Sequence, residues 1–303
     1  MLSDWLVSLE GTGAGHRLAM ALALWAAFSH ALFGALQKGR YDPWLTRAAI
    51  DAAYAAMALP LALFVVPWPE PHLWPILAGA FVIHAGYKMT QAATYARGAY
   101  TVVYPVVRGT APLFTVLGAM LFLGEHFTPG QWAGVGILVA GIWGFAIYNL
   151  RTLTEGRETL IPALGLALVT GGFVALYSTY DAWGIRATAD PFTFLAWFFL
   201  VDGLFMPAVT FRRWRRLPAS AVPGLLRLGI LGALVAWASF GAFMLATRLD
   251  KVGEAAVLRE TSTVFAALIG WLVLRETVGP RRIALMALIA AGAVVVEMGG
   301  GRA

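Results

Sequence analysis

The chain contains no cysteine and few charged residues: its 303 residues include 22 Lys or Arg, 16 Asp or Glu and five His. The absence of cysteine excludes disulfides, thiolate metal sites and cysteine nucleophiles. Soluble domains are about 25% charged, whereas this chain is 13% charged. A soluble core of this size would need far more polar surface to cover it. The composition therefore indicates a polytopic membrane protein.

Apolar sequence is abundant, with 60% hydrophobic residues and a mean hydropathy of +0.74. A helix needs about 20 apolar residues to cross a bilayer core of about 30 Å. Ten runs meet this length, at residues 17–37, 45–66, 73–95, 99–123, 130–149, 160–181, 191–211, 224–246, 253–274 and 281–298. The separators are short, and none resembles a soluble domain. We predict an all-α membrane protein with ten transmembrane helices.

Two segments in opposite halves of the chain are similar to each other. When Glu125 is superposed on Glu276, an offset of 151 residues, further identities fall in register: Arg97 and Arg248, Arg108 and Arg259, Thr110 and Thr261, Phe114 and Phe265, Pro129 and Pro280, Gly141 and Gly292. The repeat predicts two five-helix units, residues 1–150 and 151–303, in one membrane domain. Because five is odd, the second unit must cross the membrane in the opposite sense. Inverted repeats place a substrate site near the midplane, at the repeat interface.

The loop charges predict the orientation, because cytoplasmic loops carry an excess of Lys and Arg. The odd-numbered loops hold thirteen of these residues, whereas the even loops and both ends hold five. We therefore predict that both termini lie in the periplasm, and that Glu125 and Glu276 lie on opposite membrane faces. These loop residues account for the net charge of +6, so nucleic acid is not an expected partner.

Polar side chains gather on one face of the predicted third helix: His84, Tyr87, Lys88, Gln91 and Tyr95. Such a stripe must face protein or water, not lipid. One hypothesis is a cavity wall that hydrogen-bonds a substrate. The alternative is a buried network in which Lys88 pairs with an aspartate such as Asp51 or Asp181. The four that fall closest to one line are His84, Lys88, Gln91 and Tyr95, and four polar groups exceed what packing needs, which favours the cavity.

The predicted fourth helix carries Arg108 between Pro105 and Pro112. Each proline removes a backbone donor and clashes with the preceding turn, which predicts a broken helix beside a cavity. Arg108, near the midpoint and close to Tyr104, is expected to hold a carboxylate bidentately.

The predicted ninth helix has no matching prolines, and carries instead the polar run from Arg259 to Thr263. Glu260 can neutralise either Arg108 or Arg259, so an ion pair stays open as the alternative to substrate contact. We assign Arg108 to the substrate and Arg259, with Glu260, to an ion pair or gate.

Aromatic side chains with polar tips occur deep in the first, sixth and eighth predicted helices: Trp25, Tyr177, Tyr180 and Trp237. They are candidates to line the same cavity, with bundle packing as the alternative for each. Phosphate-binding loops of the form G-x-x-x-x-G-K-[ST], H-E-x-x-H motifs and acidic metal clusters are absent from the sequence. We therefore expect no cofactor, no metal and no enzyme activity.

The two Glu-ended segments resemble the EamA repeat of the drug/metabolite transporter superfamily. The resemblance is carried by Pro112, Gly118, Glu125 and the glycines 134 and 136, and is echoed around Glu276. It covers essentially the whole chain and implies two five-helix units that move small metabolites by alternating access. The second copy departs from the pattern, because Arg275 replaces the expected glycine.

The length, the aromatic interior and the polar third helix resemble the YddG-type amino-acid exporters of that superfamily. The resemblance implies an inner-membrane exporter of amino acids, aromatic ones included. Exchange of drugs, nucleobases or sugars is the alternative, ahead of a membrane enzyme or a channel. We expect a monomer, with a dimer as the alternative, and small-molecule substrate and lipid as partners. The expected substrate-binding residues are Trp25, His84, Tyr87, Lys88, Gln91, Tyr104, Arg108, Tyr177, Tyr180 and Trp237. Energy coupling stays open between a proton relay through Glu260, Asp181 or His84 and facilitated exchange.

Overall fold

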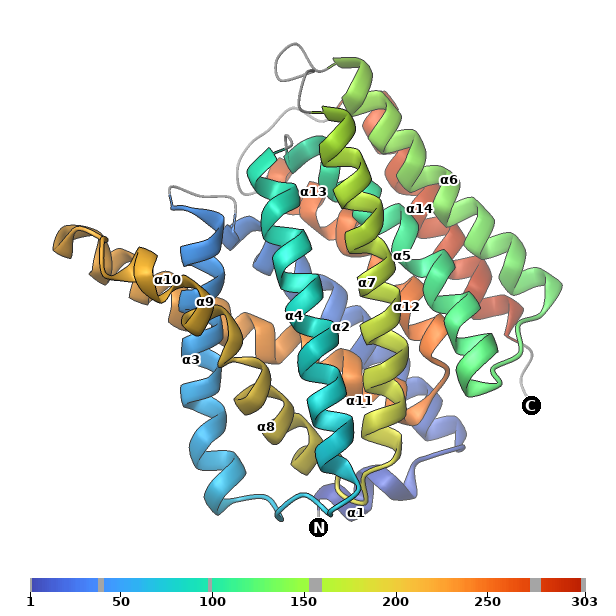
Figure 1. Ribbon diagram of the computed structural model, residues 1–303. Coiled ribbons are helices and arrows are strands. Elements are labelled where there is room, and N and C mark those ends of the chain that lie inside the picture. The colour runs from blue at the N-terminus through green and yellow to red at the C-terminus, as the bar shows by residue number, and fades with distance from the viewer. Residues whose placement is uncertain (1, 38–40, 98–99, 153–159, 273–278, 301–303) are drawn as a thin grey trace.

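A computed structural model describes residues 2–37, 41–97, 100–152, 160–272 and 279–300, which form helices and turns without any strand. The first half contains α1 (Leu2–Ser8), α2 (Gly13–Gln37), α3 (Pro43–Phe64), α4 (Leu73–Arg97), α5 (Tyr100–Leu123) and α6 (Pro129–Thr152). The second half contains α7 (Leu160–Arg186), α8 (Pro191–Asp202), α9 (Phe205–Trp214), η1 (Ala219–Ala221), α10 (Val222–Ala236), η2 (Trp237–Gly241), α11 (Ala242–Leu249), α12 (Val252–Glu260), α13 (Ser262–Leu272) and α14 (Pro280–Gly299). Long helices from both halves run side by side (Figure 1).

Six segments of the described chain are long and apolar enough to cross a membrane: Pro43–Phe64, Val106–Leu123, Pro129–Tyr148, Ile161–Arg186, Pro191–Trp214 and Ala219–Leu249. All ten predicted runs fall on helical segments. The protein is therefore an all-helical, multi-pass membrane protein, and a count of ten crossings stays a prediction.

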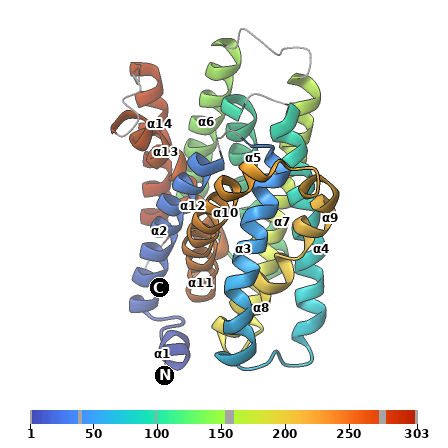
Figure 2. The same ribbon diagram turned by 90° about the vertical axis from the view of Figure 1, so that its left-hand side faces the viewer.

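Small residues let α6 and α14 pack closely against each other, and Figure 1 shows the two helices beside one another at the edge of the bundle. In the turned view of Figure 2, α14 lies at the left edge. A Cβ atom on Gly134 would lie 2.6 Å from the backbone nitrogen of Val296, and one on Gly292 would lie 2.5 Å from that of Leu138. Neither backbone can accept a methyl group without moving. Gly134 of the predicted fifth helix and Gly292 of the predicted tenth thus serve helix packing.

The predicted break in the fourth membrane segment is wrong. α5 runs continuously from Tyr100 to Leu123 through both prolines, packed against α6 and α7. Packing against neighbouring helices makes such prolines tolerable in a membrane. The break occurs instead in the ninth segment, between α12 and α13 at Thr261. There the Thr261 hydroxyl donates to the Leu258 carbonyl (2.6 Å) and the Thr263 hydroxyl to the Glu260 carbonyl (2.9 Å), so side chains satisfy the carbonyls at the break.

Two further interruptions lie in the second half of the chain. The seventh segment is divided between α8 and α9 just after Asp202, and the eighth contains the π-helical turn η2. A π turn inside an α-helix often marks a functional position. The second half therefore contributes three irregular segments, whereas α3, α4 and α5 are each continuous.

Glu125 joins the two halves at the end of the bundle where α5 finishes. Its carboxylate accepts the backbone N–H groups of Val252 (2.7 Å) and Gly253 (3.2 Å), at the start of α12. Arg186 donates to the same carboxylate (3.1 Å) and to the carbonyl of Asp250 (2.7 Å). A negative charge at a helix N-terminus is favourable. Glu276, its predicted counterpart, lies outside the described residues.

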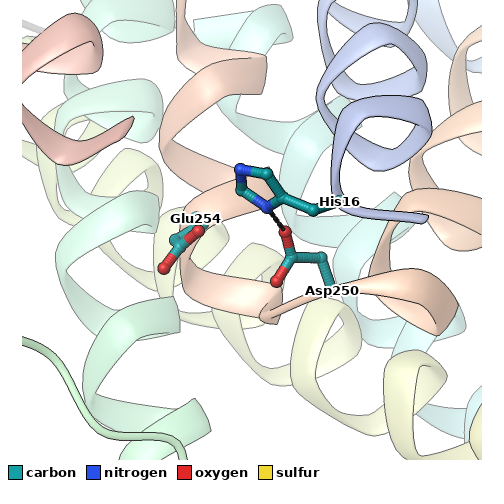
Figure 3. Close-up of side chains that lie close together, drawn as sticks. All are labelled: His16, Asp250 and Glu254. Carbon is teal, nitrogen blue, oxygen red and sulfur yellow. Dashed lines mark hydrogen bonds and ion pairs between the residues drawn. The ribbon is translucent and has the colours of Figure 1, made fainter. Parts of the chain in front are cut away.

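The same end carries a second polar cluster, around His16 at the start of α2 (Figure 3). The ring is held on one side by Asp250, and its Nε2 lies 3.0 Å from Glu297 in α14. The hydrogen bond with Asp250 raises the pKa of His16 above its usual value of 6.5. This cluster ties the beginning of the chain to its last helix.

Candidate functional site

A small cavity of about 60 Å³ lies between the two halves of the chain. Since a cavity needs about 10–15 Å³ of such space to hold one water, it has room for only a few waters in this conformation. The lining combines aromatic and ionisable side chains from both halves: His30, Phe33, Arg47, Tyr54, His84, Tyr87, Tyr177, Phe198, Phe199, Asp202, Ala236, Ser239, Phe240 and Arg259. All three irregular segments border this cavity or end beside it.

Arg259 faces the cavity without a carboxylate partner among the described residues. Its guanidinium lies over the ring of Phe243, 3.8 Å from the ring centroid, and its Nη2 has only a long hydrogen bond to Ser178 (3.5 Å). Its Nε is buried and finds no hydrogen-bond acceptor in the part of the chain that the structure describes. A buried cation of this kind is costly unless an anion satisfies it, so this donor set suits an anionic group of a ligand.

Arg108 is engaged differently from Arg259. Its Nη1 donates to Glu260 (2.9 Å), its Nε donates to the Tyr104 hydroxyl (3.3 Å), and the guanidinium lies 5.5 Å from the Tyr104 ring centroid. Neither Arg108, Tyr104 nor Glu260 lines the cavity. In this conformation the predicted ion pair of Glu260 is therefore formed with Arg108, and the arginine at the cavity is Arg259.

Lys88 is fully buried in an ion-pair network behind the cavity wall. Its ammonium contacts Asp51 (2.6 Å), the carboxylate of Asp202 (2.8 Å), the carbonyl of Asp202 (2.7 Å) and the Tyr54 hydroxyl (2.9 Å). Arg47 donates to the other oxygen of Asp51 (2.8 Å). The buried network that was the alternative for the third helix thus contains Lys88, with Asp202 joining the expected Asp51.

His84 connects this network to the cavity. Its Nε2 lies 2.8 Å from Asp181 Oδ2, and its Nδ1 lies 3.9 Å from Asp202 Oδ1. The remaining oxygen of Asp181 and that same Oδ1 of Asp202 are buried without a hydrogen-bond partner among the described residues. Two carboxylate oxygens on either side of His84 are therefore open to another donor.

Aromatic rings form the rest of the wall. Tyr177 lies 4.6 Å from the His84 ring and 4.9 Å from that of Tyr87, while Phe240 packs 5.2 Å from Phe198. Gln91 does not line the cavity, but its side-chain amide donates to the hydroxyl of Tyr87 (2.5 Å), which does. Such geometries suit contact with an apolar or aromatic group.

Besides Lys88, Gln91, Tyr104 and Arg108, three more expected site residues lie away from this lining. Trp25 is 54% exposed on α2, and Trp237 stacks on Phe199 with ring centroids 4.0 Å apart, behind the wall. Tyr180 lines a larger groove of about 570 Å³ between α5 and α7, whose other walls are largely apolar and include the exposed Leu121 and Phe122. No charged side chain is found among the described residues that line this groove, so we place the candidate site at the smaller, polar cavity.

Several lining residues were not among the expected site residues, notably Asp202, Phe198, Phe199 and Phe240. Asp202 was recognisable as an intramembrane acid, and such groups usually serve function. The phenylalanines carry no polar signal in the sequence. Their role follows only from the ends of α8 and η2 meeting at the cavity.

The described residues contain one group with the spacing of a metal site, in which ligand atoms of His16, Asp250 and Glu254 lie within 4.8 Å of one another (Figure 3). Its acids already have partners, because Glu254 accepts from Lys251 (3.2 Å) and from Gln131 (2.5 Å). The ammonium of Lys251 already supplies positive charge beside Glu254. We therefore describe this group as an interhelical tie.

Comparisons with known proteins agree with the duplicated helical architecture. The model of the EamA-like transporter family matches the chain twice, at residues 17–147 and 161–298. A crystal structure titled only as that of a protein superposes with a TM-score of 0.72 over 94% of this chain and 97% of its own, at 18% identity, which shows a shared fold. No curated protein sequence matches the chain. Because the two family matches cover most of the sequence, the chain belongs to the EamA-like transporter family of multi-pass membrane transporters.

Proposed function

We propose that the protein exports neutral amino acids, aromatic ones included, by alternating access. The observation that carries this proposal is the pair of unsatisfied charged groups at one cavity. Arg259 lacks a carboxylate partner among the described residues, and Asp202 has an unpartnered oxygen. A zwitterion carries the two complementary charges. Its carboxylate binds Arg259, and its ammonium binds Asp202.

The aromatic wall supports a substrate with an apolar side chain. Tyr87, Tyr177, Phe198 and Phe240 offer ring faces and edges but few hydrogen-bonding groups. A largely apolar wall with a few fixed polar groups is typical of small-molecule sites. It distinguishes poorly between side chains of similar polarity, so we expect several neutral amino acids to be accepted.

A cavity of about 60 Å³ is too small for such a substrate, so transport requires it to widen. The breaks after Asp202 and at Thr261, together with the π turn η2, lie where the second half meets the cavity. Discontinuous helices at the substrate site are typical of transporters built from repeats. We propose that these three segments move to admit the substrate, while the contacts of Glu125 and His16 keep their end of the bundle closed. We further propose that this closed end faces the periplasm.

The sequence-based assignment gave the substrate to Arg108 and the ion pair to Arg259. We propose the reverse for the conformation described, because Glu260 already neutralises Arg108 at 2.9 Å. Arg108 then orients Glu260 and Tyr104 behind the wall. Lys88 is proposed to hold the helices together through Asp51 and Asp202, not to bind the carboxylate.

The proposal is tested by counterflow in proteoliposomes with radiolabelled phenylalanine, leucine, nucleobases, sugars and organic cations. Arg259→Gln should weaken phenylalanine binding about 10- to 150-fold, because a hydrogen bond to a charged group contributes about 1.5–3 kcal/mol. Arg259→Lys keeps the positive charge but loses the planar guanidinium that can hold a carboxylate with two hydrogen bonds. Its affinity for phenylalanine should therefore lie between those of the wild type and Arg259→Gln. Arg212→Gln, at an exposed arginine, is the matched control. Counterflow by a sugar or nucleobase alone, or an unaffected Arg259→Gln, contradicts the proposal.

A further inference from the structure

The groove of about 570 Å³ between α5 and α7 lies apart from the polar cavity, and the proposed transport makes no use of it. Its walls include Phe114, Leu121 and Phe122 from α5 and Leu176 from α7, each at least 45% exposed. Both helices belong to segments that are long and apolar enough to cross a membrane. Because hydrocarbon surrounds such segments over about 30 Å of their length, the groove opens to lipid and not to water.

Missing side chains create the groove, while close contacts fix the two helices beside it. A Cβ atom on Gly171 would lie 2.8 Å from the Cβ of Thr110, and one on Gly118 would lie 2.9 Å from Thr179 Oγ1, so α5 and α7 touch at both places. Gly172 instead lines the groove, and a Cβ atom there would meet nothing within 4 Å. Since the helices already touch, a small shift of either one does not close the hollow at Gly172.

The groove has the length and the depth of one bilayer leaflet. It runs from Gly172, near the midpoint of α7, to Trp183, near the end of that helix. At 1.5 Å per residue this is about 16 Å, and half of a bilayer core of about 30 Å is about 15 Å. Tyr180 and Trp183, whose ring centroids lie 5.4 Å apart, stand at the outer end, and such rings favour the headgroup level. One acyl chain therefore matches the groove from the midplane to the headgroups.

A cation stands just beyond the outer end of the groove. Arg186 follows Trp183 by three residues, so the two side chains share one face of α7. The guanidinium donates to Glu125 (3.1 Å) and to the carbonyls of Thr247 (2.9 Å) and Asp250 (2.7 Å). The side chain of Arg186 is still 30% exposed, whereas that of Glu125 is 6% exposed. The more accessible charge of this ion pair is therefore positive, which complements a phosphate group.

We propose that the groove binds one phospholipid, with an acyl chain along Gly172 and Leu176 and the phosphate beside Arg186. This inference stands apart from the proposed function, because no described residue lines both the groove and the cavity. The two sites are nevertheless adjacent. Leu176 lines the groove and Tyr177 lines the cavity, so one turn of α7 contacts the lipid on one face and the candidate substrate site on another.

The first test counts bound lipid. Protein delipidated in detergent is titrated with dioleoyl phosphatidylglycerol, and native mass spectrometry should show one saturable site per monomer. Gly172→Leu fills the hollow and should weaken this binding about 10-fold, the equivalent of roughly two methylene groups displaced from their contacts. Gly165→Leu is the matched control, because a Cβ atom on this α7 glycine also meets nothing within 4 Å and Gly165 does not line the groove. Equal binding by wild type and Gly172→Leu, or no saturable site in the wild type, overturns the proposal.

The second test needs no variant. Dioleoylglycerol carries the same acyl chains without the phosphate, and the wild type should bind it about 10-fold more weakly than dioleoyl phosphatidylglycerol, because hydrogen bonding to a charged group is lost. Equal binding of the two lipids contradicts the phosphate site at Arg186. If a second copy of the chain fills the groove instead, a dimer without retained lipid should form and Gly172→Leu should dissociate it, which also overturns the proposal. None of these results depends on amino-acid transport, which counterflow tests separately.

Discussion

Replacing Lys88 by methionine should destabilise the protein more than it alters substrate binding. The ammonium is fully buried and contacts two carboxylates, a carbonyl and a hydroxyl at 2.6–2.9 Å. Removing one partner from a buried ion pair costs about 3–5 kcal/mol. Asp51 keeps Arg47 at 2.8 Å, whereas Asp202 loses its only cation among the described residues. We therefore expect a loss of about 3 kcal/mol in the free energy of unfolding, measured by titration with SDS in mixed micelles.

A control variant and a double variant test whether the buried ion pair is the cause of this loss. Lys251→Met removes an ion pair with Glu254 in which the lysine side chain is 37% exposed, and it should cost less than about 1 kcal/mol. The double variant Lys88→Met/Asp202→Asn should lose less free energy of unfolding than the sum of the losses of the two single variants, because it no longer contains the unpaired carboxylate of Asp202. If Lys88→Met unfolds like the wild type but no longer binds phenylalanine, Lys88 is a substrate ligand and our account of the network is wrong.

Three further predictions concern the rest of the bundle. Glu125→Gln should speed hydrogen exchange in the first turn of α12, since the charged acceptor for two backbone N–H groups is lost; unchanged exchange would count against the tie. Gly134→Val should lower the melting temperature through about 1–3 kcal/mol of overpacking, whereas Gly136→Val, with no atom within 4 Å of its Cβ, should not; equal effects would refute the packing account. The raised pKa of His16 means that its contact with Asp250 stabilises the fold at low pH and weakens as pH rises. The stability advantage of wild type over His16→Gln should therefore shrink between about pH 6 and pH 8, and a constant difference would contradict it.

Hydrophobic length located the helices well. Each of the ten predicted runs falls on helical chain, because about 20 apolar residues allow little other than a membrane helix. The polar face of the third helix was also recognisable, and His84, Lys88 and Gln91 are all buried together on α4. The repeat was likewise visible in the sequence, and the family model matches both copies.

The pairings between helices were beyond sequence reasoning. Lys88 was given Asp51 or Asp181 as partner, but the place of Asp202 depends on how α8 ends beside α3 and α4. The prolines suggested a break at Arg108, yet α5 is continuous there, packed against α6 and α7, and the break falls at Thr261. Which arginine lines the cavity likewise depends on whether Glu260 pairs with Arg108 or with Arg259. The alignment of the repeats treats the two arginines as equivalent, so it could not predict this pairing. The inversion of the second unit and the placement of the termini remain predictions.

The proposed transport of amino acids requires a cavity that recognises both charges of the substrate, and calorimetric binding to the purified carrier tests this directly. Phenylalanine should bind, whereas 2-phenylethylamine, which lacks the carboxylate, and 3-phenylpropionate, which lacks the ammonium, should each bind about 10- to 150-fold more weakly. In Arg259→Gln the amine should no longer be at a disadvantage to phenylalanine. Equal binding of all three compounds by the wild type would show that the ring alone is recognised, and would contradict the role of Arg259 and Asp202.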